Sequence, residues 1–175
     1  MKIVLLAVSS LDGFITRGDE ANIYEWTSKE DSTRYFEQID NAKLIFMGAK
    51  TFGIARHFMK SKVGRTRVVF TRNTAKYQSE VIPGFIEFTS EKFQDVIKRF
   101  EEKGITQAVL VGGSELQTAF LKEKLVDEIH LTVEPLIFGE GKKLVTEGMN
   151  VKLKLLSQEK LNTKGTLLLT YKVLR

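Results

Sequence analysis

One segment, residues 108–144, constrains the fold more than any other part of this 175-residue chain. It begins with an apolar run, Ala108 to Val111, which breaks at Gly112 and Gly113. An amphipathic stretch follows, and then a second β-rich run from Ile129 to Val133. This order predicts a strand, a glycine turn, a helix and another strand, a layout that presents backbone N–H groups to a phosphate. The segment therefore favours an enzyme that uses a nucleotide.

Strand-like and helix-like segments alternate along the rest of the chain. Continuous apolar runs, typical of strands buried on both faces, predict strands at residues 3–8, 44–47, 67–70 and 85–88. Near the C-terminus the pattern changes to alternating leucine and lysine, and two such runs face each other across a turn at residues 162–165. The predicted fold class is α/β, with a mostly parallel mixed sheet, helices on both faces and a C-terminal antiparallel hairpin. Because no linker or repeat divides the chain, residues 1–175 are expected to form a single domain.

Helix boundaries are predicted from capping residues and from apolar spacing. Thr27 opens a Thr-x-x-Glu capping box, so a helix is expected to begin there. A short helix is expected over residues 51–58. The clearest helix is predicted over residues 93–100, where apolar residues recur at i, i+3, i+4 and i+7. Ser90 is the expected N-cap of that helix.

The composition excludes several classes of site. With no cysteine the chain has neither disulfides nor a thiol nucleophile, and its two histidines make a metal site unexpected. No apolar stretch approaches the roughly 18 residues that a membrane span needs. The net charge is +5, but the basic residues are dispersed rather than clustered. We therefore expect a cytoplasmic protein that binds a small molecule, and neither nucleic acid nor membrane.

Three strand ends carry groups that could hold a phosphate: the diglycine turn at 112–113, the run Gly48-Ala49-Lys50-Thr51, and Thr71-Arg72. Ligands in open α/β sheets collect at the carboxyl ends of strands, and a guanidinium can pair bidentately with a 2′-phosphate. Each group also has a structural explanation, as a tight turn, a helix cap or an isolated surface arginine. Their convergence depends on the strand order, which the sequence leaves open.

Several other polar residues have both a functional and a structural interpretation. Asp12 could supply a carboxylate or only an Asx turn, and Trp26 could stack on a planar substrate or pack in the interior. Asp31 falls in the first turn of a predicted helix, where the dipole favours carboxylates regardless of function. His57 is expected at the surface, and His130 on a sheet face rather than as a catalyst.

Together these residues resemble the dihydrofolate reductase-like superfamily, and most closely the reductase domain of the riboflavin-biosynthesis deaminase–reductase with its stand-alone relatives. The matching segments span nearly the whole chain: residues 10–13, 25–28, 48–51, 109–113 and 126–128, with Pro135, Gly139 and Gly141. The diglycine turn and the closing signature from Val126 to Gly141 are the most specific of these segments.

The resemblance implies an NADPH-dependent oxidoreductase with its cofactor over the two glycine turns. The implied cofactor contacts are Ala7, Gly48, Ala49, Thr51, Thr71, Arg72, Gly112, Gly113, Ser114, Glu115 and Leu116. By the same resemblance, a homodimer is expected.

The implied substrate is 5-amino-6-(5-phosphoribosylamino)uracil or its diaminopyrimidinone counterpart, with hydride transfer to the ribose carbon. Asp12 is expected to be catalytic and to contact this substrate together with Trp26. Arg34 is expected to hold the phosphate, although the paired arginines of the family are not reproduced in register.

Two alternatives remain open at this stage. The first is dihydrofolate reduction. Relatives with that activity carry Gly-Arg where this chain has Gly48-Ala49, and they place a carboxylate in the first helix, where counting back from Gly48 gives Ser32. The second is a non-catalytic nucleotide-binding or dimerisation module that has lost its substrate site.

Overall fold

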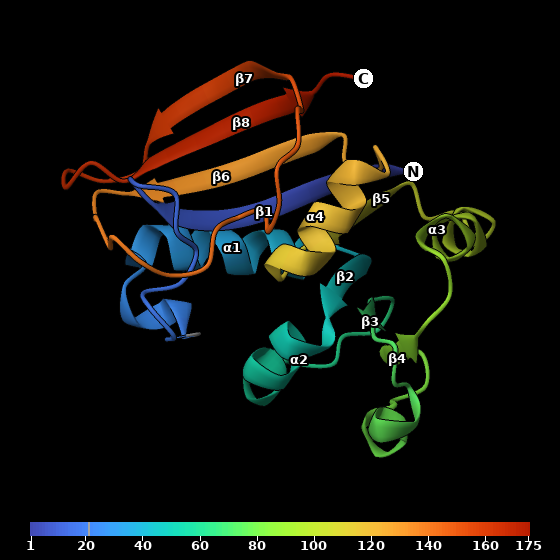
Figure 1. Ribbon diagram of the computed structural model, residues 1–175. Coiled ribbons are helices and arrows are strands. Elements are labelled where there is room, and N and C mark those ends of the chain that lie inside the picture. The colour runs from blue at the N-terminus through green and yellow to red at the C-terminus, as the bar shows by residue number, and fades with distance from the viewer. Residues whose placement is uncertain (21) are drawn as a thin grey trace.

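Eight strands form one mixed sheet in the order β4-β3-β2-β5-β1-β6-β8-β7 (Figure 1). The computed structural model describes residues 1–20 and 22–175. The strands are β1 (Lys2–Ser10), β2 (Leu44–Gly48), β3 (Thr66–Phe70), β4 (Ile86–Thr89), β5 (Gln107–Leu110), β6 (Glu128–Glu134), β7 (Leu153–Lys160) and β8 (Leu167–Val173). The pairs among β1 to β6 are parallel, whereas β8 is antiparallel to both β6 and β7. The predicted α/β fold with a C-terminal antiparallel hairpin is confirmed.

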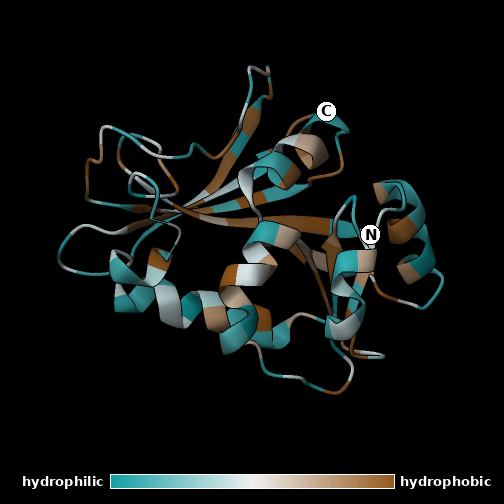
Figure 2. Ribbon diagram, turned by 60° about the horizontal axis from the view of Figure 1, so that its bottom comes forward, coloured by the Kyte–Doolittle hydropathy of each residue, from teal (hydrophilic) through white to brown (hydrophobic). Residues whose placement is uncertain are grey.

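Helices cover both faces of this sheet. They are α1 (Lys29–Asn41), α2 (Ala49–Ala55), α3 (Phe93–Glu101) and α4 (Ser114–Lys122), with 3-10 segments η1 (Ile23–Glu25), η2 (Arg56–Phe58) and η3 (Ala75–Glu80). Ile39 of α1 and Phe52 of α2 pack into the core on one face, and Phe100 of α3 and Phe120 of α4 pack into the core on the other. The apolar strands therefore lie between helices whose outer surfaces are hydrophilic (Figure 2). None of the described helices has the length and apolarity that crossing a membrane would require.

The start of α1 differs by one residue from the sequence prediction. Ser28, rather than Thr27, is the N-cap, and its hydroxyl accepts a hydrogen bond from the Asp31 backbone N–H at 3.3 Å. The Thr27 hydroxyl lies instead 3.4 Å from that of Ser32. The predicted Thr27 cap is wrong because Ser28 has the extended backbone and the spacing that capping requires.

The start of α3 also lies later than predicted. The helix begins at Phe93 with Lys92 as its N-cap residue, so Ser90 does not cap it. The Thr89 hydroxyl accepts the Glu91 backbone N–H at 3.0 Å, which turns the chain between β4 and the helix. The Ser90 prediction is wrong because this local turn takes the place of an earlier helix start.

The sheet opens between its two central strands. β1 pairs with β5 only over Lys2 to Leu5, but it pairs with β6 from Val4 to Ser10. The C-terminal part of β1 has therefore separated from β5, which ends at Leu110, with only Val111 before the diglycine turn. Crevices of this kind, at the carboxyl ends of strands where the chain order switches, are where ligands bind in open α/β sheets.

Candidate active site

A long cleft crosses the carboxyl ends of the central strands, and its walls include the turns after β2 and β3 and the start of α4. Nine of the eleven residues implied as cofactor contacts line it: Gly48, Ala49, Thr51, Thr71, Arg72, Gly113, Ser114, Glu115 and Leu116. Gly112 contacts one of these residues, because its carbonyl oxygen accepts a hydrogen bond from the Gly48 backbone N–H at 2.7 Å. Ala7 lines an adjoining pocket instead. The strand order therefore brings the three predicted strand ends to one edge of the sheet.

The two glycine turns present bare backbone to the cleft. A Cβ atom on Gly113 would lie 3.3 Å from the Thr51 hydroxyl oxygen, so even alanine would be tight there. Gly113 is also the N-cap residue of α4, and no side chain caps that helix. Gly112 has a φ of 107°, a conformation that favours glycine. Free N–H groups at a helix start, approached through glycine, fit a phosphate group.

Cationic side chains surround this part of the cleft. Lys50 bridges from α2 to Glu115 of α4, with 2.8 Å between the ammonium and the carboxylate. This bond, together with the charges of Arg72 and Lys142, lowers the pKa of Glu115 below its usual value. Arg72 itself is exposed on the cleft wall. The cleft therefore combines bare backbone with positive charge, as a phosphorylated dinucleotide requires.

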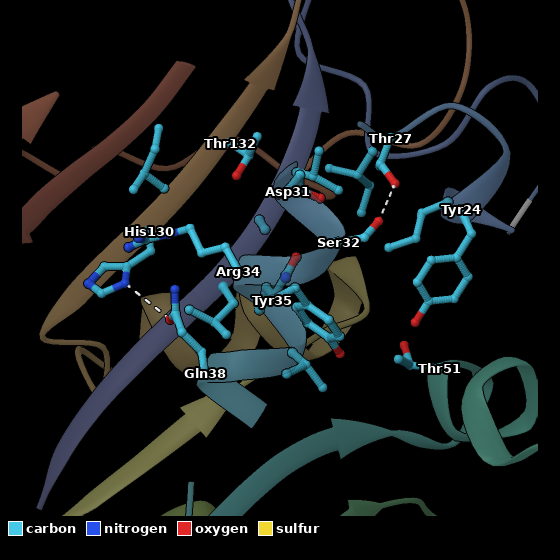
Figure 3. A pocket seen from close by; sticks show the side chains of 18 residues that line it. Tyr24, Thr27, Asp31, Ser32, Arg34, Tyr35, Gln38, Thr51, His130 and Thr132 are labelled. Atoms are coloured by element: carbon cyan, nitrogen blue, oxygen red, sulfur yellow. Dashed lines mark hydrogen bonds between the residues drawn. The ribbon is translucent and has the colours of Figure 1, made fainter. Parts of the chain in front are cut away.

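A smaller pocket adjoins the cleft and is lined by α1, β1 and β6 (Figure 3). The pocket and the cleft share six lining residues: Ile15, Ile23, Tyr24, Thr51, Val111 and Gln117. We call this shared set the junction. A ligand in the cleft can therefore meet a second ligand in the pocket at the junction.

Asp31 of α1 is a buried carboxylate in this pocket, and its residue is only 8% exposed. Burial raises the pKa of Asp31 to about 6, an effect that hydrogen bonding to Thr132 partly offsets and the nearby Glu134 charge reinforces. Thr132 projects from β6 toward Asp31 (Figure 3). The pocket thus holds a carboxyl group that keeps its proton up to about pH 6, well above the range of an ordinary aspartic acid.

The position of Asp31 is fixed by contacts between α1 and β6. The Ser28 backbone N–H donates to Glu134 at 2.7 Å, and the Thr166 hydroxyl donates to the other oxygen of that carboxylate at 2.6 Å. Glu134 is 3% exposed and ends β6. The N-terminus of α1 is therefore tied to the strand that carries Thr132.

Counting along the sequence had placed Ser32 where folate-reducing relatives carry their acid. In the structure both Asp31 and Ser32 line the pocket, but the carboxylate beside Thr132 belongs to Asp31. The placement at Ser32 stays a prediction, whereas Asp31, one residue before it, is the buried carboxylate of this pocket and therefore more than a dipole-favoured residue of the first turn. The signal that could have found it is the acidic pair Glu30-Asp31, which directly precedes the counted position.

Arg34 lies one turn after Asp31 and lines the same pocket, as its predicted role in substrate binding requires. Its Nε atom is buried and has no hydrogen-bond partner among residues 1–20 and 22–175. In Figure 3 its side chain extends toward His130. An unpaired guanidinium nitrogen at this end of the pocket suits an anionic group of a ligand.

His130 closes the same end of the pocket from β6. Its Nδ1 lies 3.3 Å from the Gln38 side-chain oxygen, and its Nε2 lies 3.4 Å from Glu128. Burial lowers the pKa of His130, an effect that the neighbouring Glu128 opposes. It occupies a sheet face, as expected, while His57 lies exposed in η2.

Asp12 and Trp26 are absent from the described linings of both the cleft and the pocket. The Asp12 carboxylate accepts hydrogen bonds from Ser10 at 2.6 Å and from the Gly139 backbone at 2.8 Å, and the Ser10 bond is the main cause of its lowered pKa. Trp26 is 8% exposed and packs edge-on against Phe138. Both residues contact the loop after β6, Asp12 through Gly139 and Trp26 through Phe138. Their catalytic and substrate-binding roles stay predictions.

Comparisons with known proteins agree with this geometry. A family model described as the RibD C-terminal domain matches residues 1–167. The uncharacterized protein YwjB of Bacillus subtilis (strain 168) is 29% identical over 170 residues, which cover 94% of this chain and 90% of that protein.

Solved structures show the same fold at lower identity. RibD of Acinetobacter baumannii gives a TM-score of 0.79 at 18% identity, covering 99% of this chain and 58% of that one. A dihydrofolate reductase from Enterococcus faecalis, complexed with NADP(H) and RAB-propyl, gives a TM-score of 0.70 at 16% identity, covering 99% and 97%. Since the family model matches almost the whole length, the chain belongs to the RibD C-terminal domain family.

Proposed function

We propose that this chain is an NADPH-dependent reductase whose substrate carries an aminopyrimidine ring. The observation that supports this most is the junction, where a cleft suited to a phosphorylated dinucleotide meets a pocket with a buried acid. Hydride transfer requires the two reacting groups to approach to about 3–3.5 Å. A shared wall between two binding spaces provides that approach.

In the cofactor half, the backbone of Gly113 and the start of α4 would hold a phosphate of the dinucleotide. Arg72 would pair with the 2′-phosphate, which distinguishes NADPH from NADH. The bound cofactor supplies the hydride, and the protein supplies binding and orientation.

In the substrate half, Asp31 and Thr132 would recognise the pyrimidine. A carboxylate beside a hydroxyl can accept hydrogen bonds from an amino group and a neighbouring ring N–H. With a pKa raised to about 6, Asp31 can also hold a proton and deliver it to the substrate. Arg34, at the other end of the pocket, would hold an anionic substituent.

The first candidate substrate is the phosphoribosylaminopyrimidine of riboflavin synthesis. The family match favours it, and so does Arg34, which lines the pocket and whose Nε has no hydrogen-bond partner in the part of the chain that the structure describes.

Dihydrofolate is the second candidate substrate. The carboxylate of Asp31 favours it, because folate-reducing relatives carry a carboxylate in the first helix and Asp31 lines the pocket from that helix. The other departure from folate-reducing relatives, Ala49 after Gly48, remains.

The test is the consumption of NADPH, followed by its nicotinamide absorbance, with each candidate substrate in turn. We expect oxidation with the pyrimidine phosphate. Oxidation with dihydrofolate alone would reverse the ranking. Saturable NADPH binding without turnover of any aminopyrimidine would favour the non-catalytic nucleotide-binding module instead.

We also propose a homodimer, as the family resemblance implies. The outermost hairpin, β7 with β8, lies at the edge of the sheet, and Leu153, Leu155 and Leu156 of β7 are 41%, 46% and 48% exposed. Light scattering should give twice the 19.9 kDa of one chain, and Leu155→Glu should reduce that mass. A monomeric wild-type protein at micromolar concentration would contradict this proposal.

A further inference from the structure

Gln117 is a buried polar residue at the junction of the cleft and the pocket. It lies on α4, is 2% exposed, and lines both spaces. Its side-chain oxygen Oε1 is buried, and no described residue of the chain donates a hydrogen bond to it. The structure thus leaves a strong hydrogen-bond acceptor unsatisfied at the place where two ligands would meet.

The next residue on the same helix shows that this is not a general property of α4. Thr118 is also 2% exposed, but its hydroxyl donates to the Ser114 carbonyl at 2.7 Å and accepts the Thr146 backbone N–H at 2.9 Å. Leaving a buried amide oxygen without a donor is costly, and native proteins rarely do so without a reason. A bound ligand that brings its own N–H group would remove that cost.

The rest of the junction narrows the choice of ligand group. Ile15, Ile23 and Val111 are apolar, and the hydroxyls of Tyr24 and Thr51 can either donate or accept. The Gln117 amide oxygen can only accept, so it selects a donor. The nicotinamide of NADPH carries such a donor, the NH₂ of its carboxamide, beside the ring carbon that reacts.

Resting on the proposed function, we propose that Gln117 Oε1 accepts a hydrogen bond from the carboxamide NH₂ of the nicotinamide. This contact fixes the rotation of the ring about its glycosidic bond. It therefore sets which face of the ring is turned toward Asp31 and Thr132 in the pocket. Gln117 would thus be a cofactor contact in addition to those at the two glycine turns.

The test compares two oxidised cofactors, NADP⁺ and its 3-acetylpyridine analogue, in which a methyl group replaces the NH₂. Affinities are measured by calorimetry for the wild type, for Gln117→Leu, which removes the acceptor, and for Gln117→Glu, which keeps an acceptor oxygen. The control is Gln158→Leu on the exposed strand β7.

We expect the wild type, Gln117→Glu and the control to prefer NADP⁺ over the analogue by about 5- to 10-fold, the ratio that one hydrogen bond provides. Gln117→Leu should bind the two cofactors equally. Gln117→Met offers the same test should the leucine variant not fold.

An unchanged preference in folded Gln117→Leu would overturn this inference and leave the proposed function standing. The inference would also be overturned if Gln117→Leu changed the KM for substrate but kept the preference for NADP⁺ over the analogue, because Gln117 would then contact the substrate. If the wild type bound neither cofactor, the proposed function itself would fail, and the inference with it.

Discussion

The cofactor cleft and the substrate pocket are built by different means. The cleft is bounded by the backbone of three strand ends, where glycine or a hydroxyl residue follows an apolar run. The pocket is made of side chains that meet across the fold, such as Asp31 on α1 and Thr132 on β6, about a hundred residues apart in the chain. A site made of backbone leaves a local pattern in the sequence, whereas a site made of distant side chains leaves none.

This difference predicts that mutations in the pocket lower turnover, whereas mutations in the cleft lower NADPH affinity. The strongest case is Asp31→Asn, which keeps the shape of the pocket but removes its ionisable group. We expect turnover to fall by roughly 10²- to 10⁴-fold, the usual contribution of a positioned acid, while NADPH affinity stays unchanged. Steady-state kinetics and cofactor titration measure the two effects.

Asp12→Asn is the matched control for Asp31→Asn, since Asp12 is the acid that the sequence alone singled out. Its carboxylate holds the backbone of Phe138 and Gly139, so we expect a smaller loss of turnover that accompanies a lower melting temperature. An equal loss of turnover in both variants, at unchanged stability, would restore Asp12 as the catalytic residue.

The converse change is in the cleft. Gly113→Val places branched atoms against the Thr51 hydroxyl, which a Cβ alone would approach to 3.3 Å. We expect NADPH affinity to fall by at least about 10-fold, since the backbone cradle would be filled. Gly148→Val, where a Cβ meets nothing within 4 Å, is the control and should bind normally. Wild-type affinity in folded Gly113→Val would refute the cradle.

The pH dependence of turnover is expected to come from Asp31 in the pocket. Because the pKa of Asp31 is raised to about 6 in the folded protein, the acid is protonated below that pH and loses its proton above it. Turnover at saturating NADPH should therefore decline about tenfold per pH unit above 6.

Protein stability should follow the same group. A carboxyl whose folded pKa lies above its unfolded value binds more protons when folded, so the free energy of unfolding falls as the pH rises from about 4 to above 6. The loss is at most about 3 kcal/mol for a shift of this size. Urea melts of the wild type and of Asp31→Asn should show this decline as a difference between the two proteins, because their other carboxyl groups titrate alike; parallel curves would contradict the assignment.

The smallest expected effect concerns cofactor choice. Arg72→Ala should weaken NADPH binding by about 10-fold through the lost 2′-phosphate contact, and it should leave NADH binding unchanged. Lys50→Ala removes a cleft cation that is already paired with Glu115, so it should weaken the binding of both cofactors equally and by no more than about 2-fold. An equal loss for both cofactors in Arg72→Ala would place that residue on another part of the dinucleotide.

The same contrast explains how much of the molecule was predictable. Apolar runs predicted the strands and the order of helices, because burial on both faces of a parallel sheet leaves a continuous pattern. The helix starts after Ser28 and Lys92 were missed because Thr27 and Ser90 are also residue types that commonly cap helices, although neither caps one in the structure. Such competition depends on geometry that spacing alone does not contain.

Within the site, the strand ends were predictable, whereas the acid of the pocket was not. Successive helix residues differ by roughly 100° in direction, so counting along the chain cannot tell whether Asp31 or Ser32 presents the acid to the pocket. Trp26 and Asp12 lie in segments that match the family, but in the structure they pack against the loop after β6. Only the three-dimensional arrangement shows that Asp31, Arg34 and His130 face one space.

The central claim is that the cleft at the glycine turns holds NADPH next to the acid pocket. Calorimetric titration of the purified protein with NADPH, and separately with NADH, tests this claim most directly. The account predicts saturable binding of one NADPH per chain, with weaker binding of NADH. Absence of binding to either cofactor would contradict it.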